Sequence, residues 1–174
     1  MNAIFYILIV IVLATSCNRT HTNYDKEELV ICEQLRKSNN QRLAREGIYS
    51  YGDGFTYDKT ITSIDGCYYT TAYKFTSVKE AMSFASTFFT EYLKPFNEEN
   101  KILSSLQNFP LTSKNLQVSI NFLDENAHPL ETPYISCIDL TRGKLTISTY
   151  DKNTSKYSDI HKESFELPLH CCRS

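Results

Sequence analysis

The chain has 174 residues, of which 41% are hydrophobic and 22% are charged, and its formal net charge is -2. This length and balance are typical of one folded domain and argue against a disordered chain. The 18 basic residues stand against 20 acidic ones, so there is no basic excess to neutralise phosphates. We therefore expect no nucleic-acid partner.

The chain begins with a segment typical of export. The apolar run from Ala3 to Ala14 is unbroken, but it is shorter than the roughly 20 residues that a membrane-spanning helix needs. It matches the apolar region of a secretory signal peptide. Small side chains at Ala14 and Ser16 then precede Cys17. These features predict a signal peptide over residues 1–16, cleaved before Cys17.

The residues at this cleavage site resemble the lipobox of bacterial lipoproteins, in which small or apolar residues precede a cysteine: Leu13, Ala14, Thr15, Ser16 and Cys17. The resemblance implies a diacylglyceryl group on the Cys17 sulfur and an acyl chain such as palmitate on the new amino terminus. Asn18 follows Cys17, and in the enteric sorting pattern a residue other than Asp at this position points to the outer membrane. We expect an envelope lipoprotein held in the membrane by this anchor, with residues 17–24 as a polar tether.

An ordinary secretory signal cut at the same bond is the alternative. It would leave a secreted soluble protein with Cys17 as a free thiol or disulfide partner. The patterns that begin at Asn18 and Asn153 match N-glycosylation acceptors, which matter only in a eukaryotic secretory route.

The cysteines leave several pairings open. If Cys17 is lipidated, an odd number remains, so at least one is unpaired within the chain, and the sequence does not determine which. No CxxC or HxxxH spacing occurs, so we predict no metal site. The remaining cysteines, of which the first three also suit a core as small apolar residues, are Cys32, Cys67, Cys137, Cys171 and Cys172.

The first half of the domain reads as a helix followed by strands. Asp25 and Glu28 form a capping box that predicts a helix over 25–46, with a thin apolar stripe and a charged, solvated remainder. Residues 47–75 read as β structure. The turn signals Gly52-Asp53-Gly54 and Asp65-Gly66 divide this stretch, and a strand is expected over 67–75.

The clearest predicted element is a second helix. Ser77 and Glu80 form its capping box, apolar residues recur on one face, and Pro95 is expected to end it. A short helix is predicted over 98–107.

Three strands are then expected to form a meander over 116–122, 134–140 and 144–150. In the predicted register Leu140 faces Leu145, Ile138 faces Ile147 and Ser136 faces Thr149. A polar segment over 151–159 and a short closing element over 160–169 complete the chain.

This order of elements predicts one α+β domain over residues 25–174. We expect an antiparallel β-sheet, a β-meander, with the two main helices packed on one face.

No enzyme signature is present, so we assign no catalytic residue and predict no cofactor. The motifs GxSxG, HExxH, GxGxxG and the Walker lysine loop are all missing. A Cys–His pair that uses Cys67 or Cys137 with His128 or His161 stays open, because such partners meet in space rather than in sequence.

Aromatic residues concentrate between positions 49 and 75. Alternating strands must send some of these rings outward, and exposed tyrosines favour contact with a protein or glycan. Ordinary use of tyrosine as a strand former is the alternative. The candidate aromatic binding surface comprises Tyr49, Tyr51, Tyr57, Tyr68 and Tyr69.

Three functions fit these observations. The first is a non-enzymatic, lipid-anchored envelope protein whose domain binds another macromolecule. The second is a periplasmic inhibitor or immunity-type module for one exported enzyme or toxin. The third is a secreted envelope hydrolase with an unrecognised site.

Overall fold

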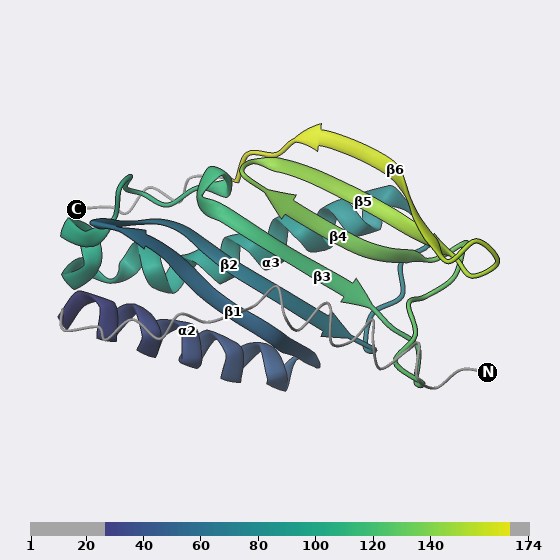
Figure 1. Cartoon of the computed structure of the whole chain (residues 1–174), viewed down its shortest axis with the longest axis horizontal. Coiled ribbons are helices and arrows are strands. Elements are labelled where there is room, and N and C mark those ends of the chain that lie inside the picture. The colour runs from purple at the N-terminus through teal and green to yellow at the C-terminus, as the bar shows by residue number, and fades with distance from the viewer. Residues whose placement is uncertain (1–26, 168–174) are drawn as a thin grey trace.

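A computed structural model of the chain describes residues 27–167 (Figure 1). The predicted signal peptide, Cys17, the tether and the last two cysteines lie outside these residues. In the described part, no helix has the length and apolar character needed to cross a bilayer. The elements in chain order are α2 (Glu27–Arg45), β1 (Ile48–Asp58), β2 (Thr60–Thr70), α3 (Val78–Glu98), the 3-10 helices η1 (Asn100–Ser105) and η2 (Ser113–Asn115), β3 (Leu116–Phe122), β4 (Ile135–Thr141), β5 (Lys144–Asp151) and β6 (Lys156–Ser164).

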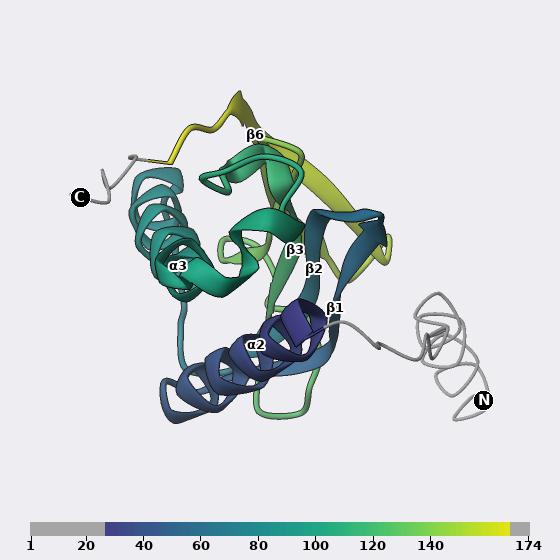
Figure 2. The same cartoon turned by 90° about the vertical axis from the view of Figure 1, so that its left-hand side faces the viewer.

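The predicted α+β class is confirmed. One six-stranded sheet has the order β1-β2-β3-β4-β5-β6, and α2 and α3 lie on the same side of it (Figure 2). Every neighbouring pair is antiparallel except β2 and β3, which are parallel. This exception follows from chain order, because α3 lies between β2 and β3 and carries the chain back across the sheet.

Helix α2 has the apolar stripe that the sequence predicted, and Leu29, Cys32 and Leu43 are buried. The rest of the helix is not wholly solvated, however, because Arg36 and Asn39 are also buried. These two polar side chains face the sheet and α3 and not water, so the prediction of a solvated charged face is wrong at Arg36.

Neither predicted turn before α3 exists. Gly52-Asp53-Gly54 lies inside β1, Asp65-Gly66 lies inside β2, and the chain turns instead at Lys59, whose φ is 60°. At Gly66 the reason is packing, because a Cβ there would lie 2.5 Å from Cε2 of Tyr68. Glycine therefore serves close approach within the strand rather than a change of direction.

The predicted strand over 67–75 ends early, at Thr70. Tyr73 and Phe75 lie beyond it and pack against the core, where both rings contact Phe84 of α3. Hydrophobic burial thus continues after the strand pairing has stopped.

The start of α3 is as predicted, and its end is not. Ser77 caps the helix by accepting a hydrogen bond from the backbone N–H of Glu80. The helix then continues through Pro95 to Glu98. Phe96 is 2% exposed, so the burial of its ring offsets the backbone hydrogen bond that proline removes. The short helix predicted over 98–107 is the 3-10 helix η1.

The predicted meander is confirmed as β3, β4 and β5, with Ile138 opposite Ile147 and Leu140 opposite Leu145. The predicted pairing of Ser136 with Thr149 is wrong, because a bulge places Ile135 there instead. The hydroxyl of Ser136 is buried and donates to the carbonyl of Leu130, which uses the extra residue of the bulge.

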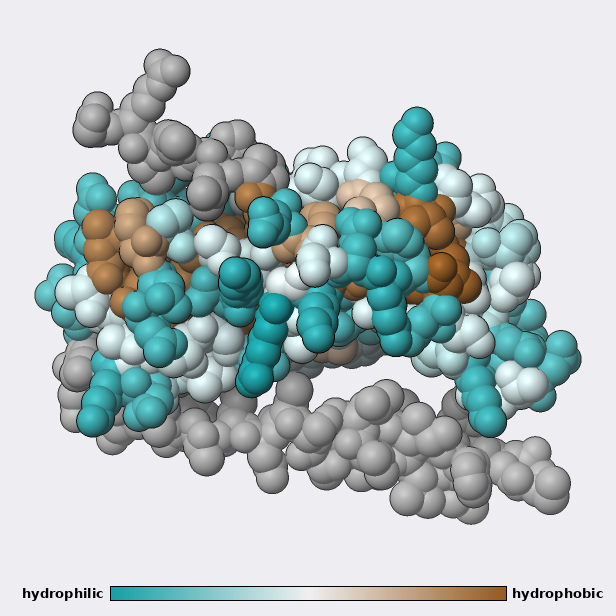
Figure 3. All heavy atoms as spheres, turned by 90° about the horizontal axis from the view of Figure 1, so that it is seen from above, coloured by the Kyte–Doolittle hydropathy of each residue, from teal (hydrophilic) through white to brown (hydrophobic). Residues whose placement is uncertain are grey.

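Strand β6 begins inside the segment predicted to be a polar loop. It is an edge strand, and most of its residues are exposed. Charged side chains on an edge strand discourage pairing with another chain. The sequence of β6 accordingly lacks the apolar alternation of a buried strand. The surface on this side is largely hydrophilic, with apolar areas between the polar side chains (Figure 3).

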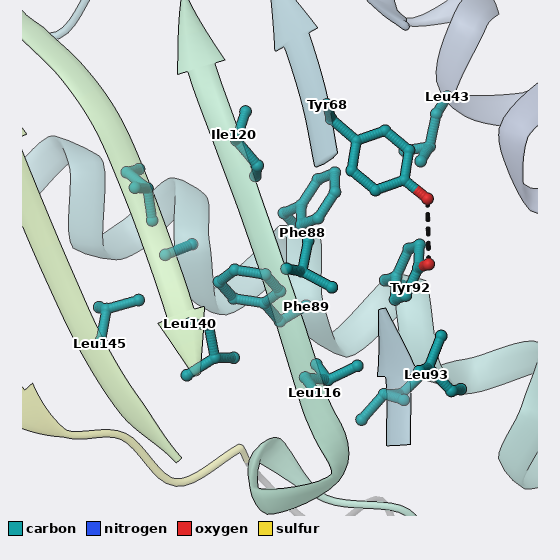
Figure 4. Packing of buried hydrophobic residues seen from close by; sticks show 14 of the residues in the cluster. Leu43, Tyr68, Phe88, Phe89, Tyr92, Leu93, Leu116, Ile120, Leu140 and Leu145 are labelled. Carbon is teal, nitrogen blue, oxygen red and sulfur yellow. Dashed lines mark hydrogen bonds between the residues drawn. The ribbon is translucent and has the colours of Figure 1, made fainter. Parts of the chain in front are cut away.

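The core fills the space between the sheet and the two helices. Phe88, Phe89 and Tyr92 of α3 point towards the apolar face of the sheet (Figure 4). The hydroxyl groups of Tyr68 and Tyr92 lie 3.0 Å apart within this core. Buried tyrosines of this kind keep a hydrogen-bond partner while their rings pack as apolar groups.

Replacement of Gly66 with Ala should destabilise the fold by about 1–3 kcal/mol. The added methyl group meets the ring of Tyr68, which is fully buried and hydrogen-bonded and so has no room to move. Gly54→Ala is the matched control, since its Cβ would have nothing within 4 Å. Urea unfolding followed by far-ultraviolet circular dichroism measures both; equal stabilities of the two variants would contradict the packing reason for Gly66.

Candidate functional site on the open face of the sheet

Among residues 27–167, the helices lie on one face of the sheet and no helix lies on the other, which we call the open face. On β3 the division is regular: Leu116, Val118 and Ile120 are buried towards the helices, whereas the alternate residues point the other way and are half-buried. The open face of β3 therefore carries Gln117, Ser119 and Asn121, as expected for a sheet with one solvated side.

Three tyrosine rings pack against one another in tilted pairs on the open face at the β1 edge, and we call them the tyrosine cluster: Tyr49, Tyr51 and Tyr69. The ring centroid of Tyr69 lies 4.4 Å from that of Tyr51 and 5.5 Å from that of Tyr49. Tyr49 remains 46% exposed and Tyr51 61% exposed. Large rings that stay this exposed while they support one another offer a preformed contact surface.

A bulge in β1 sets which side chains join this cluster. Ser50 pairs with Tyr68 and Gly52 pairs with Cys67, so Tyr51 is the extra residue. The bulge reverses the alternation beyond it. Asp53 consequently points under the sheet towards α2 instead of standing beside Tyr51 on the open face.

The other two predicted tyrosines lie elsewhere. Tyr68 is 0% exposed and belongs to the core, and Tyr57 is half-buried and packs against the same core. Both are removed from the candidate surface because their strand positions face the helices. The candidate surface thus reduces to the tyrosine cluster.

Polar side chains extend from the tyrosine cluster across β2 and β3. Ser119 and Asn121 direct their polar groups to the Cys67 sulfur at 3.5 Å and 3.8 Å. Gln117 donates to Asp65 at 3.1 Å. The neutral groups of β3 and Cys67, with the carboxylate of Asp65, form a hydrogen-bonded polar surface beside the rings, which we call the polar floor. In the sequence, only the alternation of β3 indicated it.

A second aromatic pair lies at the other edge of the sheet, where Tyr150 and Tyr157 have ring centroids 5.1 Å apart. Burial raises the pKa of Tyr157 to about 12, with smaller effects from Cys137, Tyr150, Tyr51 and Cys67. The phenol of Tyr157 therefore responds to groups of β1, β2 and β4 as well as to its neighbour on β5. The sequence analysis missed this pair, since it requires the register of β5 and β6.

Three carboxylates stand on the open face: Asp65, Asp139 and Asp159. Asp159 accepts from Lys162 at 2.7 Å and from Ser148 at 2.8 Å, and these bonds lower its pKa. The pKa of Asp139 is raised, chiefly by burial and further by Asp159, against the hydrogen bond from Thr141 that lowers it. The charge of Asp139 is thus costly to keep in the folded protein.

A buried polar network supports β1 from beneath. Arg36 of α2 pairs with Asp53 of β1, and Asn40 donates to the same carboxylate at 3.0 Å. Asn40 also accepts from the hydroxyl of Tyr68 at 3.1 Å, which reaches Tyr92 in turn. Burial raises the pKa of both tyrosines well above the ordinary value, so these hydroxyl groups stay protonated as links between elements.

A shallow groove of about 410 Å³ lies between α2 and β1, next to Tyr51. Lys37 and Gln41 line it from the helix, and Ser50 and Gly52 line it from the strand. The groove continues the accessible surface from the tyrosine cluster around the β1 edge.

The cysteines and histidines do not form the pairs left open by the sequence. Cys32 is buried in the core, whereas Cys67 and Cys137 are half-buried on the open face, and all three are free thiols. His161 lies opposite Ile147, on the helix side of the sheet, with Glu163 at 3.0 Å. His128 lies 3.7 Å from Asp124. Among residues 27–167 no group of three or more His, Cys, Asp or Glu side chains is arranged to hold a metal ion.

Comparisons with protein-family models, curated proteins and solved structures find no match to this chain.

Asp139→Asn should make the folded protein more stable at neutral pH. A raised folded-state pKa means that the contribution of Asp139 to stability is full below the pKa of the unfolded chain and is lost as pH rises through the folded-state value. Asparagine carries no charge and avoids this loss. Chemical unfolding at pH 7.5 and pH 4.5 measures the free energy of unfolding of the variant and of the wild type. The gain in stability is expected to be larger at pH 7.5. A variant that is less stable at pH 7.5 would contradict the assignment.

Proposed function

We propose that the protein is an exported lipoprotein that presents the open face of its sheet to another macromolecule in the cell envelope. The observation that carries the binding role is the tyrosine cluster, in which two rings are 46% and 61% exposed although a third ring packs against both. Tyrosine is enriched at protein interfaces because a rigid ring supplies a large contact area with little loss of entropy.

The rest of the open face favours binding over catalysis. Burial raises the pKa of the Cys137 thiol to about 12, with Asp139 and Cys67 adding to the effect, so this sulfur remains a protonated, weak nucleophile at neutral pH. The polar contacts of Cys67 are with Ser119 and Asn121, neither of which is a base.

The envelope location rests on the N-terminal sequence, where the apolar run leads to Cys17. A single acyl chain binds a membrane weakly and reversibly, whereas a diacylglyceryl group with a further chain holds firmly. Such an anchor places the domain at a membrane surface and leaves its sheet accessible to neighbours.

Cys17→Ser tests the anchor. Wild-type protein from a bacterial host should be found in the membrane fraction, with an intact mass that begins at Cys17 and includes acyl chains. The variant should keep its uncleaved leader or appear without lipid. An unmodified wild-type Cys17 terminus in the soluble fraction would instead support a secreted domain.

Photo-crosslinking tests the binding face. p-Benzoylphenylalanine in place of Tyr49 should give one discrete adduct in cells of the producing organism, because this position belongs to the tyrosine cluster. The same group at Ser83, an exposed position on α3, is the matched control and should give none. Adding Tyr51→Ala should abolish the adduct at position 49. Adducts of equal yield from both positions would refute the open face as the binding surface.

A further inference from the structure

The charges of the open face are unbalanced. The strand register places three carboxylates on it, Asp65, Asp139 and Asp159, and two lysines. Lys162 pairs with Asp159, whereas Lys144 lies opposite Thr141 at the end of β4. Within residues 27–167, neither Asp65 nor Asp139 has a Lys, Arg or His nitrogen within ion-pair distance (Asp65 accepts from Thr56, Ser63 and Gln117 and Asp139 from Thr141).

Asp139 shows most clearly what is missing. Its carboxylate is half-buried, it lies near the charge of Asp159, and a threonine hydroxyl is a weak substitute for a cation. A partly buried charge without a counter-charge costs free energy that an arriving ammonium or guanidinium group offsets. The site around Asp139 is therefore complementary to positive charge.

The rings favour the same chemistry. A lysine or arginine head group is attracted to the face of a tyrosine ring, and its aliphatic stem packs against the same ring. The ring pair Tyr51 and Tyr69 borders the polar floor on one side, and the ring pair Tyr150 and Tyr157 lies at the opposite edge of the sheet. A cationic segment that crosses the floor from β1 to β4 would thus meet first the rings and then the carboxylates.

We propose that the open face binds a lysine- or arginine-bearing segment of a partner protein. This inference rests on the proposed binding function and specifies the class of the partner. Tyr51 and Tyr69 receive the aliphatic stems and rings of the segment, while Asp65 and Asp139 receive its cationic groups.

The test uses the full chain in a non-ionic detergent and a short arginine–glycine repeat peptide. Its citrulline counterpart, which has nearly the same shape but no charge, is the matched ligand control. The chain has no tryptophan, so tyrosine fluorescence reports binding directly. The arginine peptide should bind, more weakly as salt is raised, and the citrulline peptide should not.

Variants separate a specific site from general attraction. Asp139→Asn and Tyr51→Ala should each weaken binding of the arginine peptide about fivefold or more. Glu91→Gln removes the same charge from an exposed position on α3 and should change the affinity by less than about twofold. Because Asp139→Asn is expected to stabilise the fold, its loss of binding would not reflect unfolding; Asp65→Asn provides a second measurement.

Three results would overturn the proposal. Equal losses from Glu91→Gln and Asp139→Asn would show attraction to net charge alone. Equal binding of the citrulline peptide would show that the positive charge is irrelevant. Binding of a neutral oligosaccharide that depends on Tyr51, without binding of the arginine peptide, would assign the face to glycans and leave the proposed function intact. Failure of the cross-link at position 49 is the separate result that removes the proposed function.

Discussion

The ion pair between Arg36 and Asp53 is the constraint on which the arrangement of the N-terminal half depends. Both side chains are almost completely buried, at 7% and 4% exposed, so the Asp53 carboxylate requires the Arg36 cation, which also pairs with Glu33 of its own helix. Asn40 extends the pair to Tyr68, which contacts Tyr92, and four elements are thereby tied together: α2, β1, β2 and α3. Apolar packing alone would tolerate a shift of α2 along the sheet, whereas this hydrogen-bonded set permits one position.

The same constraint shapes the open face. Asp53 reaches Arg36 only because the extra residue at Tyr51 reverses the alternation of β1. The strand consequently has tyrosines pointing outward on one side of the bulge, whereas beyond it Phe55 faces the core. The bulge thus determines both which side chains of β1 lie on the surface and which lie in the core. The position of the tyrosine cluster therefore depends on a buried ion pair on the opposite side of the sheet.

The sequence predicted the fold best where periodicity alone decides the structure. The N-cap at Ser77 and the alternation over 116–122 needed no tertiary information, and both are confirmed, although the Glu80 carboxylate accepts from the Ser77 hydroxyl and not from its backbone N–H. The two predicted turns were wrong because contacts with residues distant in sequence override the local signals. Asp53 pairs with Arg36, and the missing side chain at Gly66 leaves space for the ring of Tyr68. The candidate site was predictable only in part, because the identification of half-buried Asp139 requires the register of several strands.

The parallel junction between β2 and β3 divides the sheet into two parts with different origins. Strands β3 to β6 pair with their chain neighbours, whereas the junction pairs Ile64 with Leu116, across the whole of α3. Pairing between strands that are close in sequence forms quickly. A contact between residues this distant in sequence forms more slowly, because closing the long loop between them costs conformational entropy. Tyr51 and Tyr157 belong to different parts, so the open face is complete only after this slow step. A partner that touches both parts would therefore hold the junction closed, and its binding would be coupled to the final stage of folding.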